Sequence, residues 1–300
     1  MDLLKVNSNN ENLLDDFFYF IKNHKPHGHK DWPEIKEEFC SSLTNELYEK
    51  KSFLYLVTES KTILNYFYIK FEKSIKRIIL LSYNPEDLIK YSKCLLELKN
   101  KKNYSIEIGL RDFEISKFIK NSSYFKIYKH YNLMDLKKID YAPTNPVISQ
   151  HNLIFKNIEN SEDIKNLVKI QNECFNDHHG YEINTYVSIK NELNLKSTSY
   201  KNVHVICNEE KNWMAYAWMF VYKEKATGKL SMCGVRKQFR SLGLAQKIIN
   251  IAIQKLFDQG LNKIILEVDN ENHAAKKIYS KMGFKTYDNI NWYTLKPELI

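Results

Sequence analysis

Glycine and proline are both scarce, with eight and six residues among 300. This scarcity excludes collagen-like and low-complexity segments, which need far more of either residue. A run of 18 apolar residues is also missing, so the sequence predicts no membrane-spanning helix. The first twelve residues are mostly polar and lack the basic-then-apolar order of a secretory signal. We therefore expect no membrane partner and a cytoplasmic location.

The five cysteines are widely spaced and odd in number, and they form no CxxC pair. This disfavours a disulfide framework and a cysteine-based metal site, and favours a reducing compartment. Only four arginines occur, so the net charge of +9 comes almost wholly from scattered lysines. Nucleic-acid sites cluster their charge, and arginine is the residue that reads bases and grips phosphate in bidentate fashion. We therefore expect no nucleic-acid partner.

What the sequence does contain is enough apolar material for two packed cores. Hydrophobic residues make up 43% and charged residues 27%, which excludes a disordered chain, and 300 residues suggest about two domains of ~150 residues. Pro143 and Pro146 lie within four residues of each other, and proline stops helices. The sequence therefore predicts a linker at 141–151 between domains at 1–140 and 152–300.

The second half alternates between strand and helix patterns. In the helix predicted at 242–259, apolar residues recur at three- and four-residue spacing, and Gly260 stands where a left-handed cap belongs. This order predicts a mixed α/β sheet with helices on both faces. The predicted strands are 153–157, 203–207, 213–222, 230–235, 263–268, 284–287 and 291–295, and the other helices are 161–175, 186–195 and 272–282.

The first half shows a similar order and a faint sequence echo of the second. Phe125-Lys-Ile-Tyr resembles Phe284-Lys-Thr-Tyr at an offset of 159 residues. Together with the element order, this indicates a duplicated fold. The predicted strands are 53–58, 63–71, 76–82, 104–109 and strands from 125, and the helices are 11–23, 33–48, 85–98 and 113–121.

The segment Cys233–Ala245 lies between a predicted strand and the helix at 242–259. A helix N-terminus has unpaired N–H groups and a positive dipole end, so it suits phosphate. Gly243 would allow close approach, and Arg240 would add a charge. The segment matches neither a Walker loop nor a dinucleotide fingerprint. An ordinary strand-to-helix turn with a packing glycine is the alternative.

The pattern Arg240-x-x-Gly243-x-Ala245 after a strand resembles the pyrophosphate loop of the GNAT superfamily of N-acetyltransferases. A second pattern, Leu266-Glu-Val268 followed by Asn272-x-x-Ala-x-x-Ile-Tyr279, is similar to the later strand and helix of that family. The resemblance covers 151–300. It implies an acetyl-CoA site between two splayed parallel strands, with Tyr279 near the sulfur, and no metal. The other cofactor-binding residues that it implies are Cys233, Gly234, Val235, Arg240, Ser241, Leu242, Gly243, Leu244, Ala245 and Asn272.

Direct transfer to an amine needs a base for the ammonium and a proton donor for the departing thiolate. By the resemblance, Tyr279 is the candidate donor, with a buried core aromatic as the alternative. Glu267 is the candidate base, because it alternates out of an apolar strand. A solvated or ion-paired strand residue is the alternative for Glu267.

The family resemblance places the acceptor wall at the link between the two early helices. There His178, His179 and Tyr181 are candidates for contacting the amine, and a polar loop without a role is the alternative. Adjacent histidines do not easily share one zinc ion. A covalent cysteine is disfavoured, because a buried cysteine is usually a small apolar residue.

The first half lacks the features of the loop at Cys233–Ala245. Acidic residues at 83–87 replace the glycine cradle, and Lys120 stands opposite Tyr279. We expect a degenerate GNAT-like domain that binds no cofactor, a tandem arrangement loosely similar to the mycothiol synthase group. The expected activity is acetyl transfer from acetyl-CoA to a primary amine of a small molecule, by a monomer or homodimer. A protein or peptide N-acetyltransferase and a non-catalytic acyl-CoA-binding regulatory module are the alternatives.

Overall fold

The computed structural model describes residues 2–24, 27–28, 32–33, 35–48, 52–84, 104–111, 125–143, 152–178 and 181–295. The chain forms two compact units, 1–130 with 290–300 and 131–289. No helix in the described ranges is both long enough and apolar enough to cross a membrane.

The described part of the first unit is a sheet with α1 and α2 on one face. Its strand order is β1-β3-β4-β5-β6-β13, antiparallel except for the parallel pair β5 and β6, and β2 also pairs with β5. The elements are β1 (Asp2–Val6), α1 (Glu11–Asn23), β2 (His27–Gly28), α2 (Lys36–Tyr48), β3 (Phe53–Glu59), β4 (Thr62–Glu72), β5 (Arg77–Tyr83), β6 (Ser105–Arg111), β7 (Phe125–Lys137) and the end of β13 (Lys285–Leu295).

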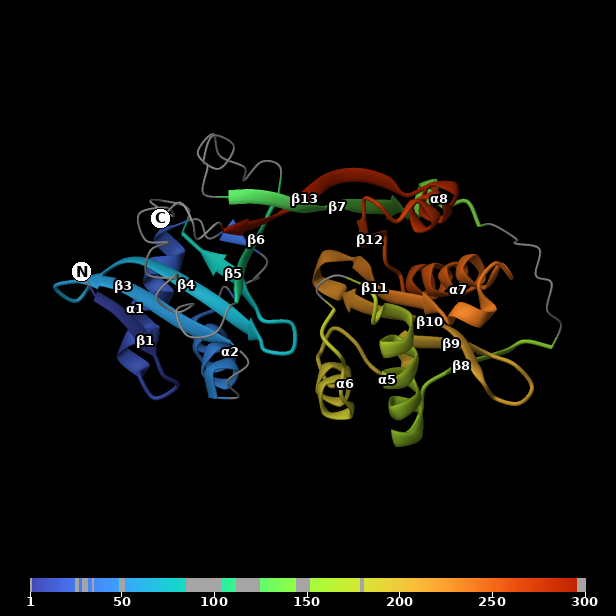
Figure 1. Cartoon of the computed structure of the whole chain (residues 1–300), viewed down its shortest axis with the longest axis horizontal. Helices are drawn as coiled ribbons and strands as arrows, with labels where there is room; N and C mark the ends of the chain where they lie inside the picture. Colours follow the sequence, from blue (N-terminus) through green and yellow to red (C-terminus); the bar gives the residue numbers. More distant parts are fainter. Residues whose placement is uncertain are drawn as a thin grey trace. The chain divides into compact units, whose positions relative to one another are not determined.

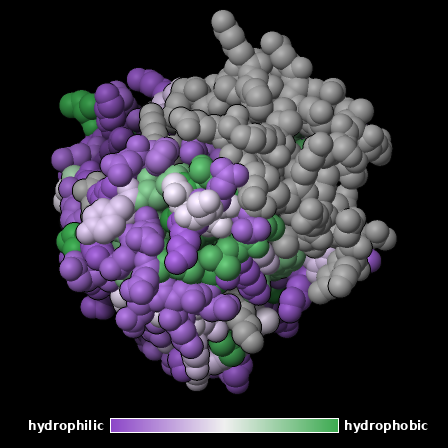
Figure 2. Space-filling model, turned by 90° about the vertical axis from the view of Figure 1, so that its left-hand side faces the viewer, coloured by the Kyte–Doolittle hydropathy of each residue, from purple (hydrophilic) through white to green (hydrophobic). Residues whose placement is uncertain are grey.

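Alternation along β3 shows how this sheet buries both faces. Leu54 and Leu56 pack with α1 and α2, whereas Tyr55 and Val57 belong to a second apolar cluster on the opposite face. Figure 2 views the molecule from the side of this unit, and hydrophilic residues cover most of the coloured surface, with hydrophobic residues between them. Single exposed apolar side chains such as Tyr48 are ordinary on folded proteins, so this surface carries no argument about function.

The second unit repeats the same plan. Its strand order is β7-β12-β11-β10-β9-β8, and among these described strands only β11 and β12 run parallel. The elements are β8 (Ile154–Asn157), α5 (Ser161–Phe175), α6 (Tyr186–Leu193), β9 (Val203–Cys207), β10 (Trp213–Tyr222), β11 (Thr227–Val235), α7 (Leu244–Asp258), β12 (Lys263–Asp269) and α8 (His273–Lys281), with short 3₁₀ helices at Lys138–Asp140, Tyr200–Asn202, Lys223–Lys225 and Lys237–Phe239.

Two apolar clusters hold the second unit together, one on each face of its sheet. Figure 1 shows α5 and α6 on the opposite side of this sheet from α7. The three- and four-residue spacing along α7 turns Ile248, Ile249 and Ala252 towards one face. On the other face, α5 and α6 cover Tyr216 and Trp218. The predicted mixed α/β fold is therefore confirmed.

The two units share topology and one irregularity. In each, the middle antiparallel pair has a β-bulge just past the last residue that pairs with the parallel strand, at Leu81 in β5 and at Ser231 in β11. Tyr66 and Tyr216, both fully buried, then occupy equivalent positions. The predicted duplication is therefore confirmed for the described strands. The helices predicted at 85–98 and 113–121, and Lys120, lie outside the described residues.

One predicted pair of strands is wrong. The segments 284–287 and 291–295 form a single strand, β13. No residue between them has the positive φ of a tight turn. Side chains of β7 and β13 are hydrogen-bonded to each other along this single strand. Asn132 donates to Asn289 at 2.8 Å, and His130 bonds Asn291 at 2.6 Å.

The last strand of each half completes the sheet of the other half. Residues 131–137 of β7 pair with β12, and residues 290–294 of β13 pair with β6. The sequence predicts domains at 1–140 and 152–300 because of the two prolines between them. Residues 144–151 of that linker lie outside the described residues. The compact units instead divide the chain between 130 and 131 and between 289 and 290.

A fragment that begins at residue 152 should therefore be less stable than a fragment 131–289. It lacks β7, so β12 becomes an unpaired edge, and Met134 and Leu136 leave the core. Removing each of these side chains from a core costs about 2–5 kcal/mol. We expect fragment 152–289 to aggregate or to unfold without cooperativity, as followed by circular dichroism on heating. Equal melting temperatures for the two fragments would contradict the exchange of strands.

The buried His204 on β9 makes stability depend on pH. Asn157 Nδ2 donates to His204 Nδ1 at 2.9 Å, and burial, with a smaller effect from Lys255, lowers the pKa of His204 to about 4. The unfolded chain binds this proton near pH 6.5. The neutral ring therefore stabilises the fold fully above pH 6.5, and this contribution is lost as the pH falls towards 4.

We expect the unfolding free energy to fall by about 3 kcal/mol between pH 6.5 and 4 because of this one group. Urea melts at several pH values measure the slope. His204→Gln should flatten the slope in that window, and an unchanged slope in the variant would show that another group is responsible.

Candidate functional site

The parallel strands β11 and β12 part from each other after a short paired stretch. Their register contains three pairs, from Thr227 with Lys263 to Lys229 with Ile265. Beyond them, both strands continue through described residues without pairing to each other, β11 to Val235 and β12 to Asp269. The bulge at Ser231 bends β11 at this point. The result is an open edge at the carboxyl ends of parallel strands, where ligands bind in α/β sheets.

The helix α7 begins beside this opening, and no side chain caps its N-terminus. Its N-cap is Gly243, at φ 79°, and its first internal hydrogen bond runs from Lys247 N to Gly243 O. The N–H groups of the first turn, from Leu244 to Gln246, therefore have no partner within the helix. Ser241 also has a positive φ of 68°, a conformation that costs a non-glycine residue energy and is concentrated at ligand sites.

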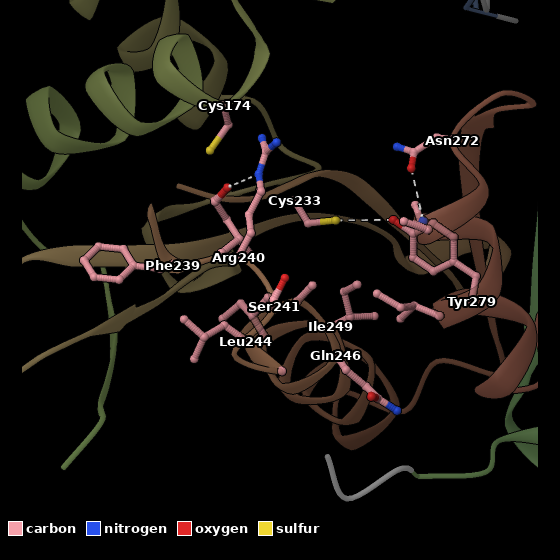
Figure 3. Close-up of a pocket in the computed structure, with 18 of the residues that line it drawn as sticks. Cys174, Cys233, Phe239, Arg240, Ser241, Leu244, Gln246, Ile249, Asn272 and Tyr279 are labelled. Carbon is pink, nitrogen blue, oxygen red and sulfur yellow. Dashed lines mark hydrogen bonds between the residues drawn. The ribbon is translucent and has the colours of Figure 1, made fainter. Parts of the chain in front are cut away.

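A cavity of about 770 Å³ joins the opening and the helix N-terminus (Figure 3). Its volume is in the range of small-molecule sites. It is lined by Cys174, Phe175, His178, Cys233, Gly234, Val235, Phe239, Arg240, Ser241, Gly243, Leu244, Ala245, Gln246, Ile248, Ile249, Asp269, Glu271, Asn272, Ala274, Ala275, Ile278 and Tyr279.

Tyr279 presents a protonated hydroxyl in this cavity. Its side chain comes from α8 and is 6% exposed, and its hydroxyl lies 3.3 Å from Cys233 Sγ on β11 (Figure 3). Burial first, and the Cys233 thiol second, raise the pKa of Tyr279 well above its usual value. The phenol therefore stays neutral across the physiological range and remains a hydrogen-bond donor.

All of the cofactor residues predicted from the sequence line this cavity except one. Leu242 does not line it and packs against the core of α7 instead. Asn272 lines it, while its side chain accepts a hydrogen bond from Ala275 N and so caps α8. Arg240 lines the wall and donates from Nε to Val235 O at 3.3 Å.

The three predicted acceptor residues differ in whether they line the cavity. His178 lines the cavity, Tyr181 does not, and His179 lies outside the described residues. Tyr181 instead donates to Asn172 at 2.8 Å and accepts from Asn184, and burial raises the pKa of Tyr181 to about 12. Tyr181 therefore holds the link between α5 and α6 in shape.

Glu267 lies outside the cavity wall. Its neighbours Leu266 and Val268 enter the core with α7, so Glu267 points to the other face of β12. Its side chain is 41% exposed, and Lys229 Nζ lies 2.9 Å from Oε1. The structure therefore does not place Tyr279 and Glu267 in one cluster, and the base role of Glu267 stays a prediction.

Two carboxylates that the sequence did not predict, Asp269 and Glu271, also line the cavity. The side chain of Asp269 accepts from Glu271 N at 3.0 Å, which forms the turn into α8. Asp269 is the last residue of β12, which runs parallel to β11. Ligands bind at the carboxyl ends of parallel strands, so this position could have indicated Asp269 from the sequence.

Ion pairs surround the mouth of the cavity on the α5 side. Arg236 lies 2.7 Å from Glu173, and Lys237 bonds Asp177. The hydrogen bond and charge of Lys237 lower the pKa of Asp177. These pairs are partly exposed and contribute little to stability, but they position the basic loop that precedes α7.

The cavity thiols are poor nucleophiles. Burial raises the pKa of Cys174 to about 11 and also raises the pKa of Cys233, so both remain thiols at neutral pH. Within the ranges that the structure describes, no three His, Cys, Asp or Glu side chains gather as a metal site.

The site suits a nucleotide diphosphate attached to an extended arm. Unpaired N–H groups at the start of α7 and the cation of Arg240 favour a negative group. The open edge of β11 offers backbone groups to an extended ligand, which would add to the sheet as a strand does. Coenzyme A has both parts, so the residues fit it.

Comparison with known proteins finds a family match within the second half of the chain. Residues 164–284 match the acetyltransferase (GNAT) family. A mycothiol acetyltransferase of Paenarthrobacter aurescens is 33% identical over 85 residues, 27% of this chain and 26% of that protein. N-alpha-acetyltransferase 30 of Saccharomyces cerevisiae is 39% identical over 57 residues, 19% of this chain and 32% of that protein. The chain thus matches about a quarter to a third of the length of these relatives.

A solved structure, the tandem GNAT protein from the clavulanic acid biosynthesis pathway without AcCoA, shares the fold along nearly the whole chain. The two superpose with a TM-score of 0.64 at 10% identity, over 98% of this chain and 97% of that one. The duplicated plan thus corresponds to a tandem arrangement already seen in this fold.

Proposed function

We propose that the second unit, whose residues 164–284 form a GNAT domain, transfers an acetyl group from acetyl-CoA to a primary amine of a small molecule. One observation carries the proposal: the opening between β11 and β12 and the uncapped N-terminus of α7 meet in one cavity. The likeness to mycothiol acetyltransferase supports a small-molecule acceptor.

Bound acetyl-CoA would supply an activated acetyl group, whose C–S bond breaks as the amine nitrogen forms the new C–N bond. The start of α7 would hold the diphosphate, and β11 would orient the arm. Tyr279 would give its proton to the departing sulfur, because it is a buried neutral donor. Glu267 would take the ammonium proton through water.

A peptide N-terminus is the second candidate acceptor, supported by the match to N-alpha-acetyltransferase 30. We propose no cofactor site in the first unit. A cytoplasmic location, a monomeric or homodimeric state, and the absence of nucleic-acid and membrane partners remain expectations from the sequence.

Thiol release from acetyl-CoA in the presence of an amine panel tests the proposal. The panel contains polyamines, amino sugars, amino acids and short peptides with free N-termini. We expect release that depends on a small amine. Release only with peptides would favour the second candidate, and tight binding of acetyl-CoA without any release would indicate a non-catalytic acyl-CoA-binding module.

A further inference from the structure

An ion pair stands at the point where β11 and β12 part. Lys229 is the last residue of β11 that pairs with β12, opposite Ile265. Glu267 lies two residues further along β12, on the same face as Ile265. The Lys229 Nζ and Glu267 Oε1 atoms are 2.9 Å apart, with side chains 29% and 41% exposed.

The fold itself gains little from this pair. Partly exposed ion pairs contribute about 0–1 kcal/mol, and the β11–β12 pairing and the apolar core on the opposite face do not involve either side chain. Burial lowers the pKa of Lys229, but the charge and hydrogen bond of Glu267 outweigh it and raise the pKa overall. The positive charge of Lys229 is thus held beside the Glu267 carboxylate.

Other ionisable groups share this face of the second unit, since paired strand residues point the same way. Tyr222 and Tyr287 act electrostatically on Lys229. The rest follow from register and alternation on β12, β7 and β13: Lys263, Asp269, Tyr131, Asp135, Lys137 and Lys285.

We infer that Lys229 is a positioning residue for acetyl transfer: it keeps the Glu267 carboxylate ionised and fixes its direction beside the opening between β11 and β12. The inference rests on the proposed function. The ammonium of the acceptor would lose one proton through water to this carboxylate, which leaves the amine free to attack. No electrons are transferred in that step.

The test is the pH profile of kcat/KM, measured on the whole chain with acetyl-CoA and the best amine of the panel. Lys229→Met should move the acidic limb up by about one pH unit, because a neighbouring cation lowers a carboxyl pKa by about that much or more. It should leave the KM for acetyl-CoA unchanged. Lys229→Arg should keep the wild-type profile. Lys229→Gln, which has a polar but uncharged side chain, should shift the acidic limb as Lys229→Met does.

Lys263→Met is the matched control, since it removes a lysine on the same face of β12 as Glu267 and leaves the ion pair between Lys229 and Glu267 in place. Its profile should match wild type. In a Glu267→Gln background, Lys229→Met should cause no further loss, because coupled residues are not additive.

An unmoved limb in Lys229→Met, or an equal loss with and without Glu267, would overturn this inference alone. A folded wild-type chain that acetylates no amine would overturn the proposed function, and this inference with it.

Discussion

Replacing Tyr279 with phenylalanine is expected to lower kcat by about 10²–10⁴-fold, the usual contribution of a positioned proton donor. The affinity for acetyl-CoA should stay within about twofold, because the ring still fills its place beside Phe284. The reason is the state of the hydroxyl: it is buried, neutral and next to Cys233. Steady-state rates and equilibrium binding separate the two effects.

Tyr200→Phe serves as the control for this experiment. Tyr200 is a half-buried tyrosine of the same unit that does not line the cavity, so its hydroxyl should be dispensable. If Tyr279→Phe retained full kcat, Tyr279 would be a core aromatic, which is the alternative that the sequence left open.

Replacing Gly243 with glutamate is expected to weaken the binding of coenzyme A by at least about 100-fold, or about 2.8 kcal/mol. The substitution puts a side chain at φ 79° and a negative charge where the N–H groups of α7 start. Both oppose a diphosphate there. Titration calorimetry with coenzyme A measures the loss directly.

Gly260→Glu is a matched control at the other end of the same helix. Gly260 has φ 82° and open space where a Cβ would lie, so the strain and the charge are similar but distant from the cavity. It should lower the melting temperature and leave coenzyme A affinity near wild type. Equal losses of affinity in both variants would mean that helix stability, not the cradle, determines binding.

Local sequence signals predicted several elements of the second half residue by residue. The helix at 161–175 and the strands at 203–207 and 213–222 match the structure fully, because strong periodicity and end signals agree there. The positive φ of Gly260 also follows the prediction.

Non-local features were beyond the reach of these signals. The strand β1 was missed because only Val6 is buried in it, so no alternation marks it. The exchange of β7 and β13 depends on which distant strand each one pairs with, and no local pattern specifies a partner.

The candidate site shows the same division. Gly243 and Ala245 could be placed at the cavity from the sequence, because a tight strand-to-helix turn needs small residues locally. Alternation gave the correct face for Glu267 but not its ion pair with Lys229, which joins residues 38 apart in sequence.

The central claim is that coenzyme A binds between β11 and β12, with its diphosphate at the start of α7. A crystal structure of the whole chain soaked with coenzyme A tests it most directly. We predict the diphosphate against the backbone N–H groups of 243–245 and the arm along 233–235. Coenzyme A bound elsewhere, or a cavity left empty at a saturating concentration, would contradict the claim.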